Sequence, residues 1–227
     1  NAPIINRRGY AFPHALPKLM QAQGWDCTMM LGLYGSFFDY GRIQPRIGYR
    51  WQGIEELGLV QHVGMFGDEF GARDLEFAEA VAARLPALPE RVLLHCTTMS
   101  SHIPWLQWHD IPSCQGESLS VPGTADDYAR SLRYADHAID RLIAAFLARW
   151  PDGLAVVYGD HAACIDADGY ASPVARRDGV QWEFVPIIVL GRDVPARRVP
   201  IAGSQLDIQR TILAAAGWSG SAPSWGM

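Results

Sequence analysis

An acidic residue and a histidine stand side by side directly after one apolar run of the chain. The run Leu154–Tyr158 is followed by Gly159, Asp160 and His161. Carboxylate oxygens and imidazole nitrogens both bind zinc or manganese, and a glycine lets the backbone turn so that adjacent side chains can reach one ion. Asp160 and His161 are therefore candidate ligands of a divalent metal ion. The alternative is that they form part of a polar surface or a helix cap.

A second polar segment follows the apolar run Arg91–Thr97. It is rich in hydroxyl groups and leads to His102, which is followed closely by Pro104 and Trp105. A histidine at this point could hydrogen-bond a substrate oxygen or stabilise charge on a phosphoryl group, which makes His102 the candidate catalytic residue. The alternative is a loop histidine that is satisfied by backbone groups.

A third candidate segment is the aromatic-rich loop Gly35–Arg42, which follows the apolar run Asp26–Gly32 and is called the aromatic loop below. Aromatic rings and one arginine suit contact with the organic part of a substrate and with an anion. Aromatic residues in such loops also often fill the core beneath the loop, so this alternative stays open. The candidate substrate-binding residues are Phe38, Tyr40 and Arg42, together with Trp105 of the second segment.

The elements that must position these residues alternate along the chain. Helical periodicity and strand-length apolar runs take turns, which predicts an α/β fold with a mostly parallel sheet and helices on both faces. Ligands in such folds bind beyond the carboxyl ends of the strands. No linker or repeat divides residues 1–227, which we interpret as a single domain. The predicted helices are 15–23, 68–84, 124–150 and 204–216, and the predicted strands are 26–32, 91–97, 154–158 and 185–190.

The helix 124–150 has the clearest pattern. Its apolar residues recur every three or four positions, and Pro151 stops it. The runs 154–158 and 185–190 are almost continuously apolar, which is typical of parallel strands covered on both faces. The expected apolar face of the helix consists of Tyr128, Leu132, Ala135, Ile139, Leu142 and Phe146.

Composition limits the function classes. The chain has 227 residues, is 49% hydrophobic and carries a net charge of −5, which argues against a broad cationic surface and hence against nucleic acid as a partner. No apolar run reaches the ~18 residues of a membrane-spanning helix. The four cysteines lack zinc-module spacing, and Cys27 and Cys96 fit buried core positions as well as disulfides. The chain begins with Asn, which suggests a fragment or processed product.

Four blocks together resemble the alkaline phosphatase and sulfatase superfamily, in particular its lipoteichoic acid synthase and phosphoglycerol transferase branch. Their order and spacing, and above all the string Tyr-Gly-Asp-His, carry the resemblance. They cover nearly the whole chain. The blocks are Leu16–Gly24 leading to Ser36-Phe37-Phe38, then Thr97–Trp105, then Tyr134-Ala135-Asp136 leading to Tyr158–His161, then Val185–Ile188 leading to Ser204–Asp207 and Thr211.

The resemblance implies a metal-dependent phosphoester transferase or hydrolase with an alkaline phosphatase-like fold. It implies that Asp160 and His161 bind one divalent ion (Mn, Mg or Zn) and that His102 contacts the substrate phosphate. The family's Trp and Arg are replaced by Phe38 and Tyr40, with Arg42 two residues further, so the substrate head group is open. The family's nucleophilic Thr and an acidic ligand would lie upstream, and the isolated chain is therefore expected to be inactive.

Two other functions stay open at this point. A sulfatase, which would bind Ca, needs Cys or Ser in the pattern Cys/Ser-x-Pro-x-Arg, and none of the four cysteines has it. A non-catalytic module that binds anionic glycans or lipid head groups is the other. The resemblance also implies a small-molecule or lipid head-group phosphoester substrate, and a membrane-anchored full-length protein on the periplasmic or extracellular face.

Overall fold

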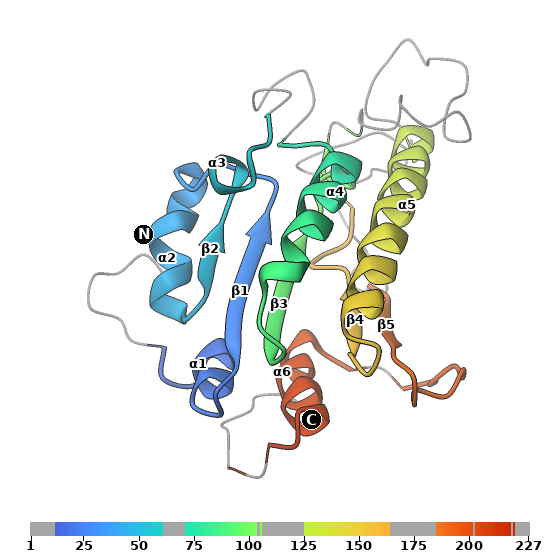
Figure 1. Cartoon of the computed structure of the whole chain (residues 1–227). Helices are drawn as coiled ribbons and strands as arrows, with labels where there is room; N and C mark the ends of the chain where they lie inside the picture. The colour runs from blue at the N-terminus through green and yellow to red at the C-terminus, as the bar shows by residue number, and fades with distance from the viewer. Residues whose placement is uncertain are drawn as a thin grey trace, which may run out of the picture.

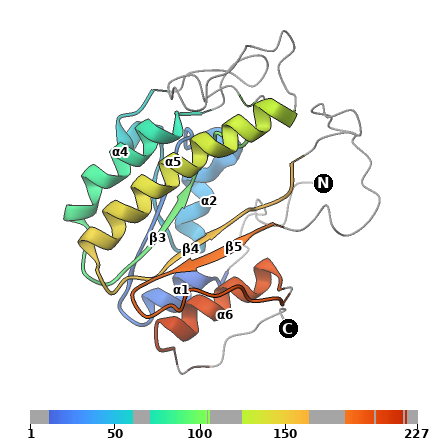
Figure 2. The same ribbon diagram turned by 90° about the vertical axis from the view of Figure 1, so that its right-hand side faces the viewer.

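The computed structural model describes residues 12–60, 71–103, 105, 125–163, 185–201, 203–218 and 220. Within them, strands form two small sheets, and helices cover both sides (Figures 1 and 2). The α/β fold class is confirmed. The described part of the chain contains no helix that is both long and apolar enough to cross a bilayer.

The first sheet has three parallel strands in the order β2-β1-β3. They are β1 (Asp26–Leu31), β2 (Arg50–Gln52) and β3 (Val92–Thr97). The register pairs Leu31 with Thr97, so β1 and β3 end at the same edge of the sheet. The predicted strands 26–32 and 91–97 are confirmed, whereas β2 was missed because three residues are too few for a recognisable pattern.

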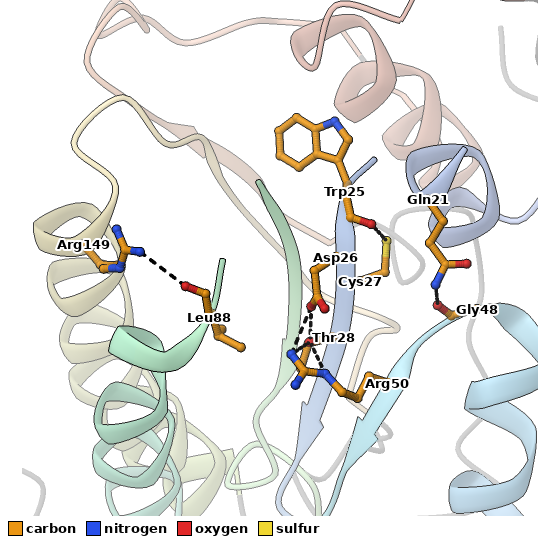
Figure 3. Close-up of polar contacts among 9 residues, drawn as sticks. All are labelled: Gln21, Trp25, Asp26, Cys27, Thr28, Gly48, Arg50, Leu88 and Arg149. Carbon is orange, nitrogen blue, oxygen red and sulfur yellow. Dashed lines mark hydrogen bonds and ion pairs between the residues drawn. The ribbon is translucent and has the colours of Figure 1, made fainter. Parts of the chain in front are cut away.

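A polar network joins β1 to β2 near their amino ends, away from that edge. Arg50 donates to the Thr28 hydroxyl from Nε at 3.2 Å and from Nη2 at 2.9 Å, and Thr28 donates to Asp26 at 2.6 Å (Figure 3). Thr28 is fully buried, so these bonds satisfy a hydroxyl that would otherwise destabilise the core. The network stabilises the pairing of β1 with β2 at the end of the sheet opposite to its carboxyl edge.

The second sheet pairs β4 (Ala155–Tyr158) with β5 (Ile187–Leu190) in antiparallel orientation. Both strands were predicted, but as parallel strands covered on both faces, and that prediction is wrong. Ile187 and Ile188 are 44% and 50% exposed. A continuously apolar run predicts a strand, but it contains no information about the direction of the neighbouring strand or about which face is covered.

Helices cover the two sides of the sheets. On one side α4 (Asp74–Arg84) packs against α5 (Ala125–Arg149), and on the other lie α1 (Leu16–Gln21) and α6 (Gln205–Ala215), as Figure 2 shows. The four predicted helices are confirmed as elements, although α4 begins at Asp74 rather than at 68. Short elements that were not predicted are α2 (Tyr40–Ile47), α3 (Ile54–Leu57) and the 3-10 turns Phe37–Asp39 and Leu85–Ala87.

The buried face of α5 differs in part from the predicted stripe. Ser131, Tyr134 and Ala138 are buried, whereas Leu132, predicted to face the core, is 43% exposed. Toward the end of the helix the predicted Leu142 and Phe146 do pack against the core cluster around Phe77. The predicted Ala135 is also buried, so apolar spacing placed much of the stripe correctly and misplaced Leu132.

The two described cysteines are free. Cys27 is buried and Cys96 is half-buried, and burial raises the pKa of their thiols to about 11 and about 12. Both therefore act as small core residues, which was one of the two alternatives left open by the sequence. Cys114 and Cys164 lie outside the described residues.

Candidate active site

Asp160 and His161 lie just beyond the carboxyl end of β4 and are 80% and 64% exposed at the side chain. Nδ1 of His161 lies 2.9 Å from the carbonyl oxygen of Ala162. A carbonyl oxygen only accepts, so this contact requires the proton on Nδ1. The lone pair of a neutral imidazole is then on Nε2, which lies 3.7 Å from Oδ2 of Asp160.

This arrangement fits half of a metal site. Two lone-pair donors 3.7 Å apart have about the separation expected when both bind one ion at ~2.0–2.2 Å. A backbone carbonyl on the second ring nitrogen is the usual way in which a ligating histidine is oriented. Among the residues that the structure describes, no group of three or more metal-ligating side chains occurs, so further ligands would have to come from elsewhere.

The first residue of α6 supports the loop that carries the pair. The Gln205 amide donates to the carbonyl oxygens of Gly159 at 2.8 Å and Asp160 at 2.6 Å. A reciprocal capping box between Ser204 and Asp207 fixes the start of α6. The capping pattern is visible in the sequence, but the contact of Gln205 with a loop 45 residues away is not.

His102 is exposed and lies on a turn that follows β3. Its backbone N–H donates to the carbonyl oxygen of Met99 at 2.9 Å, and its Nδ1 lies 2.6 Å from the carbonyl oxygen of Ile103. The same reasoning assigns a proton to Nδ1, so a neutral ring has its lone pair on Nε2. The contact of His102 with a substrate phosphate stays a prediction.

A cavity of about 730 Å³ runs between β3 and β4 and connects the two loops. Thr98 and Ser101 line it on the β3 side, and Gly159 and Asp160 line it on the β4 side. The segments that carry the predicted catalytic histidine and the predicted metal ligands therefore border one space. The sequence predicted this only in general terms, through the rule that strand ends meet at one edge.

The aromatic loop lies at the end of β1. Phe38 is 70% exposed, while Tyr40 stacks on Trp51 with ring centroids 5.9 Å apart. Arg42 pairs with Asp39, three residues earlier, and its Nε donates to Oδ2 at 2.6 Å. Phe38 thus presents its ring to solvent, whereas Tyr40 supports the loop and the charge of Arg42 is shared with a neighbouring carboxylate.

Trp105 is only 1% exposed, so a substrate cannot reach its ring in this conformation. Its indole donates to the carbonyl oxygen of Ser101 at 3.0 Å, and its ring lies 5.2 Å from that of Tyr128. In this conformation Trp105 packs the His102 turn against α5. This corresponds to the core-filling alternative, and its predicted contact with a substrate stays a prediction. Trp108 lies outside the described residues.

An α/β sheet with carboxylate and imidazole donors at one strand end and a histidine at another is an arrangement that hydrolytic and group-transfer domains can use. The sequence model of the sulfatase family matches residues 6–218. The chain belongs to the sulfatase family.

Known proteins agree with this assignment. The chain is 25% identical over 156 residues to lipoteichoic acid synthase-like YvgJ of Bacillus subtilis, covering 63% of the chain and 25% of that protein. It superposes on the lipoteichoic acid synthase LtaP of Listeria monocytogenes with a TM-score of 0.62 and 17% identity, covering 93% of the chain and 55% of LtaP. It also superposes on an alkaline phosphatase superfamily protein of Vibrio parahaemolyticus with a TM-score of 0.67 and 15% identity. That superposition covers 96% of the chain and 51% of the Vibrio protein.

These matches confirm the predicted superfamily and its lipoteichoic acid synthase branch. The similarity to the solved structures supports the fold. The chain spans about a quarter of the length of YvgJ and about half of each solved structure.

Proposed function

We propose that this chain forms part of the catalytic domain of a metal-dependent phosphoester transferase or hydrolase. The observation that carries the proposal is the orientation of His161. Its Nδ1 proton is committed to a backbone carbonyl, so its Nε2 lone pair faces a carboxylate oxygen 3.7 Å away. A proton on Nε2 would make this contact an ion pair, whereas a divalent ion between the two atoms would use both lone pairs.

In this proposal Asp160 and His161 bind one divalent ion, and manganese, magnesium and zinc all suit the donor set. A bound ion would neutralise charge on a phosphoryl group and activate a hydroxyl nucleophile. The imidazolium form of His102, protonated on both ring nitrogens, would donate from Nε2 to a phosphoryl oxygen and stabilise charge as it develops. Phe38 would contact the organic part of the substrate. By resemblance the nucleophile is a threonine upstream of the matched blocks, and isolated residues 1–227 are inactive.

The proposed substrate is a phosphoester of a small molecule or lipid head group, handled on the periplasmic or extracellular face by a membrane-anchored protein. This part of the proposal rests on the similarity to lipoteichoic acid synthases. The negative net charge of the chain argues against nucleic acid as substrate.

Titration with Mn²⁺ tests the metal site directly. We expect the chain to bind Mn²⁺, and both Asp160→Ala and His161→Ala to weaken binding at least tenfold while the circular dichroism spectrum is unchanged, because both side chains are exposed. Asp193→Ala, an exposed carboxylate elsewhere, is the matched control. Equal Mn²⁺ affinity in all four proteins would refute the proposed site.

The reaction is tested on the longest protein that contains this chain. We expect metal-dependent release of p-nitrophenol from a phosphate ester, lost in Asp160→Ala and slowed in His102→Ala without loss of bound metal. Turnover of p-nitrophenyl sulfate instead would establish the sulfatase alternative. Metal binding without turnover of either ester would favour the binding module.

A further inference from the structure

Asp74 is a buried carboxylate with no part in the reaction proposed above. It is the first residue of α4, and its side chain is 1% exposed. Its Oδ1 accepts from the backbone N–H of Met99 at 2.6 Å, and its Oδ2 accepts from the backbone N–H of Ser100 at 3.0 Å. Both oxygens are thus used by the loop that follows β3.

Burying a carboxylate in order to form these two bonds costs free energy, so the bonds point to a role beyond helix capping. Burial disfavours the charged form and raises the pKa of Asp74, whereas the hydrogen bonds from Met99 and Ser100 lower it. An acidic residue in the first turn of a helix is common because it complements the helix dipole, but that role requires no bonds to a distant loop. Asp74 instead reaches 25 residues along the chain to Met99.

The turn that Asp74 holds is the turn of His102. The N–H of Met99 donates to the Asp74 carboxylate, and the carbonyl oxygen of Met99 accepts from the N–H of His102 at 2.9 Å. One hydrogen-bonded path thus leads from Asp74 through Met99 to the backbone of His102. Met99 and Ser100 are both buried, so water does not compete readily for these bonds.

The residues just before Asp74 are hydrogen-bonded to the end of β1. Two residues before Asp74, the N–H of Ala72 donates to the carbonyl oxygen of Gly32 at 2.8 Å. Gly71 lies so close that a Cβ there would be 2.6 Å from that oxygen. The segment 71–74 therefore bridges the carboxyl ends of β1 and β3, where the aromatic loop and the His102 turn begin.

We propose that Asp74 is a positioning residue that fixes the His102 turn relative to the strand ends and so aims the imidazole at the phosphoryl group. The inference rests on the proposed function for the role of His102. The anchoring of the turn by Asp74 is testable independently of any activity.

Amide hydrogen exchange on the full chain tests the anchoring. In the wild type we expect the amides of Met99 and Ser100 to be protected. Asp74→Asn keeps the side-chain shape but replaces one acceptor oxygen with a donor, and should accelerate exchange at these two amides roughly tenfold or more, with β1 unchanged. Asp140→Asn, which changes an exposed carboxylate on α5, is the control and should leave amide exchange at Met99, at Ser100 and in β1 as in the wild type.

Unprotected Met99 and Ser100 amides in the wild type would overturn the inference, and this measurement does not depend on whether a variant folds. Unchanged exchange in Asp74→Asn would overturn it too, and so would acceleration spread equally over β1 and β3, since that would show a purely structural role.

Phosphate affinity, measured on the longest protein that contains this chain, is a second test of the positioning role. We expect Asp74→Asn to weaken binding of inorganic phosphate roughly tenfold at unchanged Mn²⁺ affinity, while Asp140→Asn retains both. Phosphate affinity equal to the wild type in Asp74→Asn would refute positioning. If the wild type binds neither Mn²⁺ nor phosphate, the proposed function fails, and aiming at a phosphoryl group fails with it, whereas the exchange experiment still decides the anchoring.

Discussion

At the scale of single residues, the candidate site depends on groups that orient other groups. The carbonyl oxygen of Ala162 sets the tautomer of His161, and Gln205 holds the backbone of Asp160. Loss of a supporting contact of this kind typically weakens metal binding by about 10- to 100-fold. They place the functional atoms without touching a substrate.

Gln205→Ala tests this support. We expect it to weaken Mn²⁺ binding by about tenfold, because the loop that carries Asp160 and His161 loses two hydrogen bonds. Gln209→Ala is a matched control one turn along α6, where the amide donates to the carbonyl oxygen of His14 instead. Isothermal titration would measure both, and an equal loss of affinity in the two variants would contradict a specific role for Gln205.

Phe38 also yields a residue-scale prediction. It adopts a left-handed conformation at φ 44° while its ring is 70% exposed, and backbone strain without burial is a mark of functional loops. Phe38→Gly should change the free energy of unfolding by less than about 1 kcal/mol, since relief of strain offsets the flexibility of glycine. Urea unfolding would measure it, together with the KM for the ester in the longest protein, which should rise. A large loss of stability would instead assign Phe38 to packing.

At the scale of elements, the segment before α4 makes a close backbone contact with the end of β1. Gly71 has φ +80° and its Cα faces the carbonyl oxygen of Gly32. Only a residue without a side chain can pass there. This close approach allows Asp74 to reach the loop after β3.

Gly71→Ala and Gly24→Ala separate conformational strain from steric contact. Both glycines have nearly the same positive φ, but a Cβ at Gly24 would meet nothing within 4 Å. Gly24→Ala should therefore cost about 1 kcal/mol of unfolding free energy, from backbone strain alone. Gly71→Ala should cost at least about 1 kcal/mol more, because the 71–74 segment must move. Equal costs by urea unfolding would show that the close contact is absent in solution.

At the scale of the whole molecule, β3 of the first sheet and β4 of the second both line the cavity, and His95 of β3 lies there beside Tyr49. Burial lowers the pKa of His95, because the charged imidazolium loses its hydration. The unfolded chain therefore binds a proton at this position more readily than the folded chain does. The stability that this difference provides is present above the unfolded value of about 6.5 and is lost as pH falls toward the folded pKa.

His95→Gln should reduce this pH dependence. Between pH 7.5 and 5.5 the wild type should lose more unfolding free energy than the variant, with a difference of up to about 1 kcal/mol. His14→Gln, which replaces an exposed histidine, is the control. Thermal unfolding across this pH range would measure it, and parallel curves for the wild type and His95→Gln would show that His95 is well hydrated.

The sequence by itself determined the fold class, the principal helices and strands, and the family. Apolar periodicity is a local property, and the Tyr-Gly-Asp-His string at residues 158–161 is contiguous, so neither needs knowledge of distant contacts. It also placed Asp160, His161 and His102 in loops at strand ends, since those loops follow apolar runs.

Only the tertiary structure decided how these residues are held. The antiparallel pairing of β5 with β4, the burial of Trp105, and the contacts of Gln205 and Asp74 all join residues far apart in the chain. The sequence pattern of a strand or a loop shows which residues avoid water, but not which partner they meet. The partner is selected when the whole chain packs, because one fold must satisfy every buried polar group and fill the core at once.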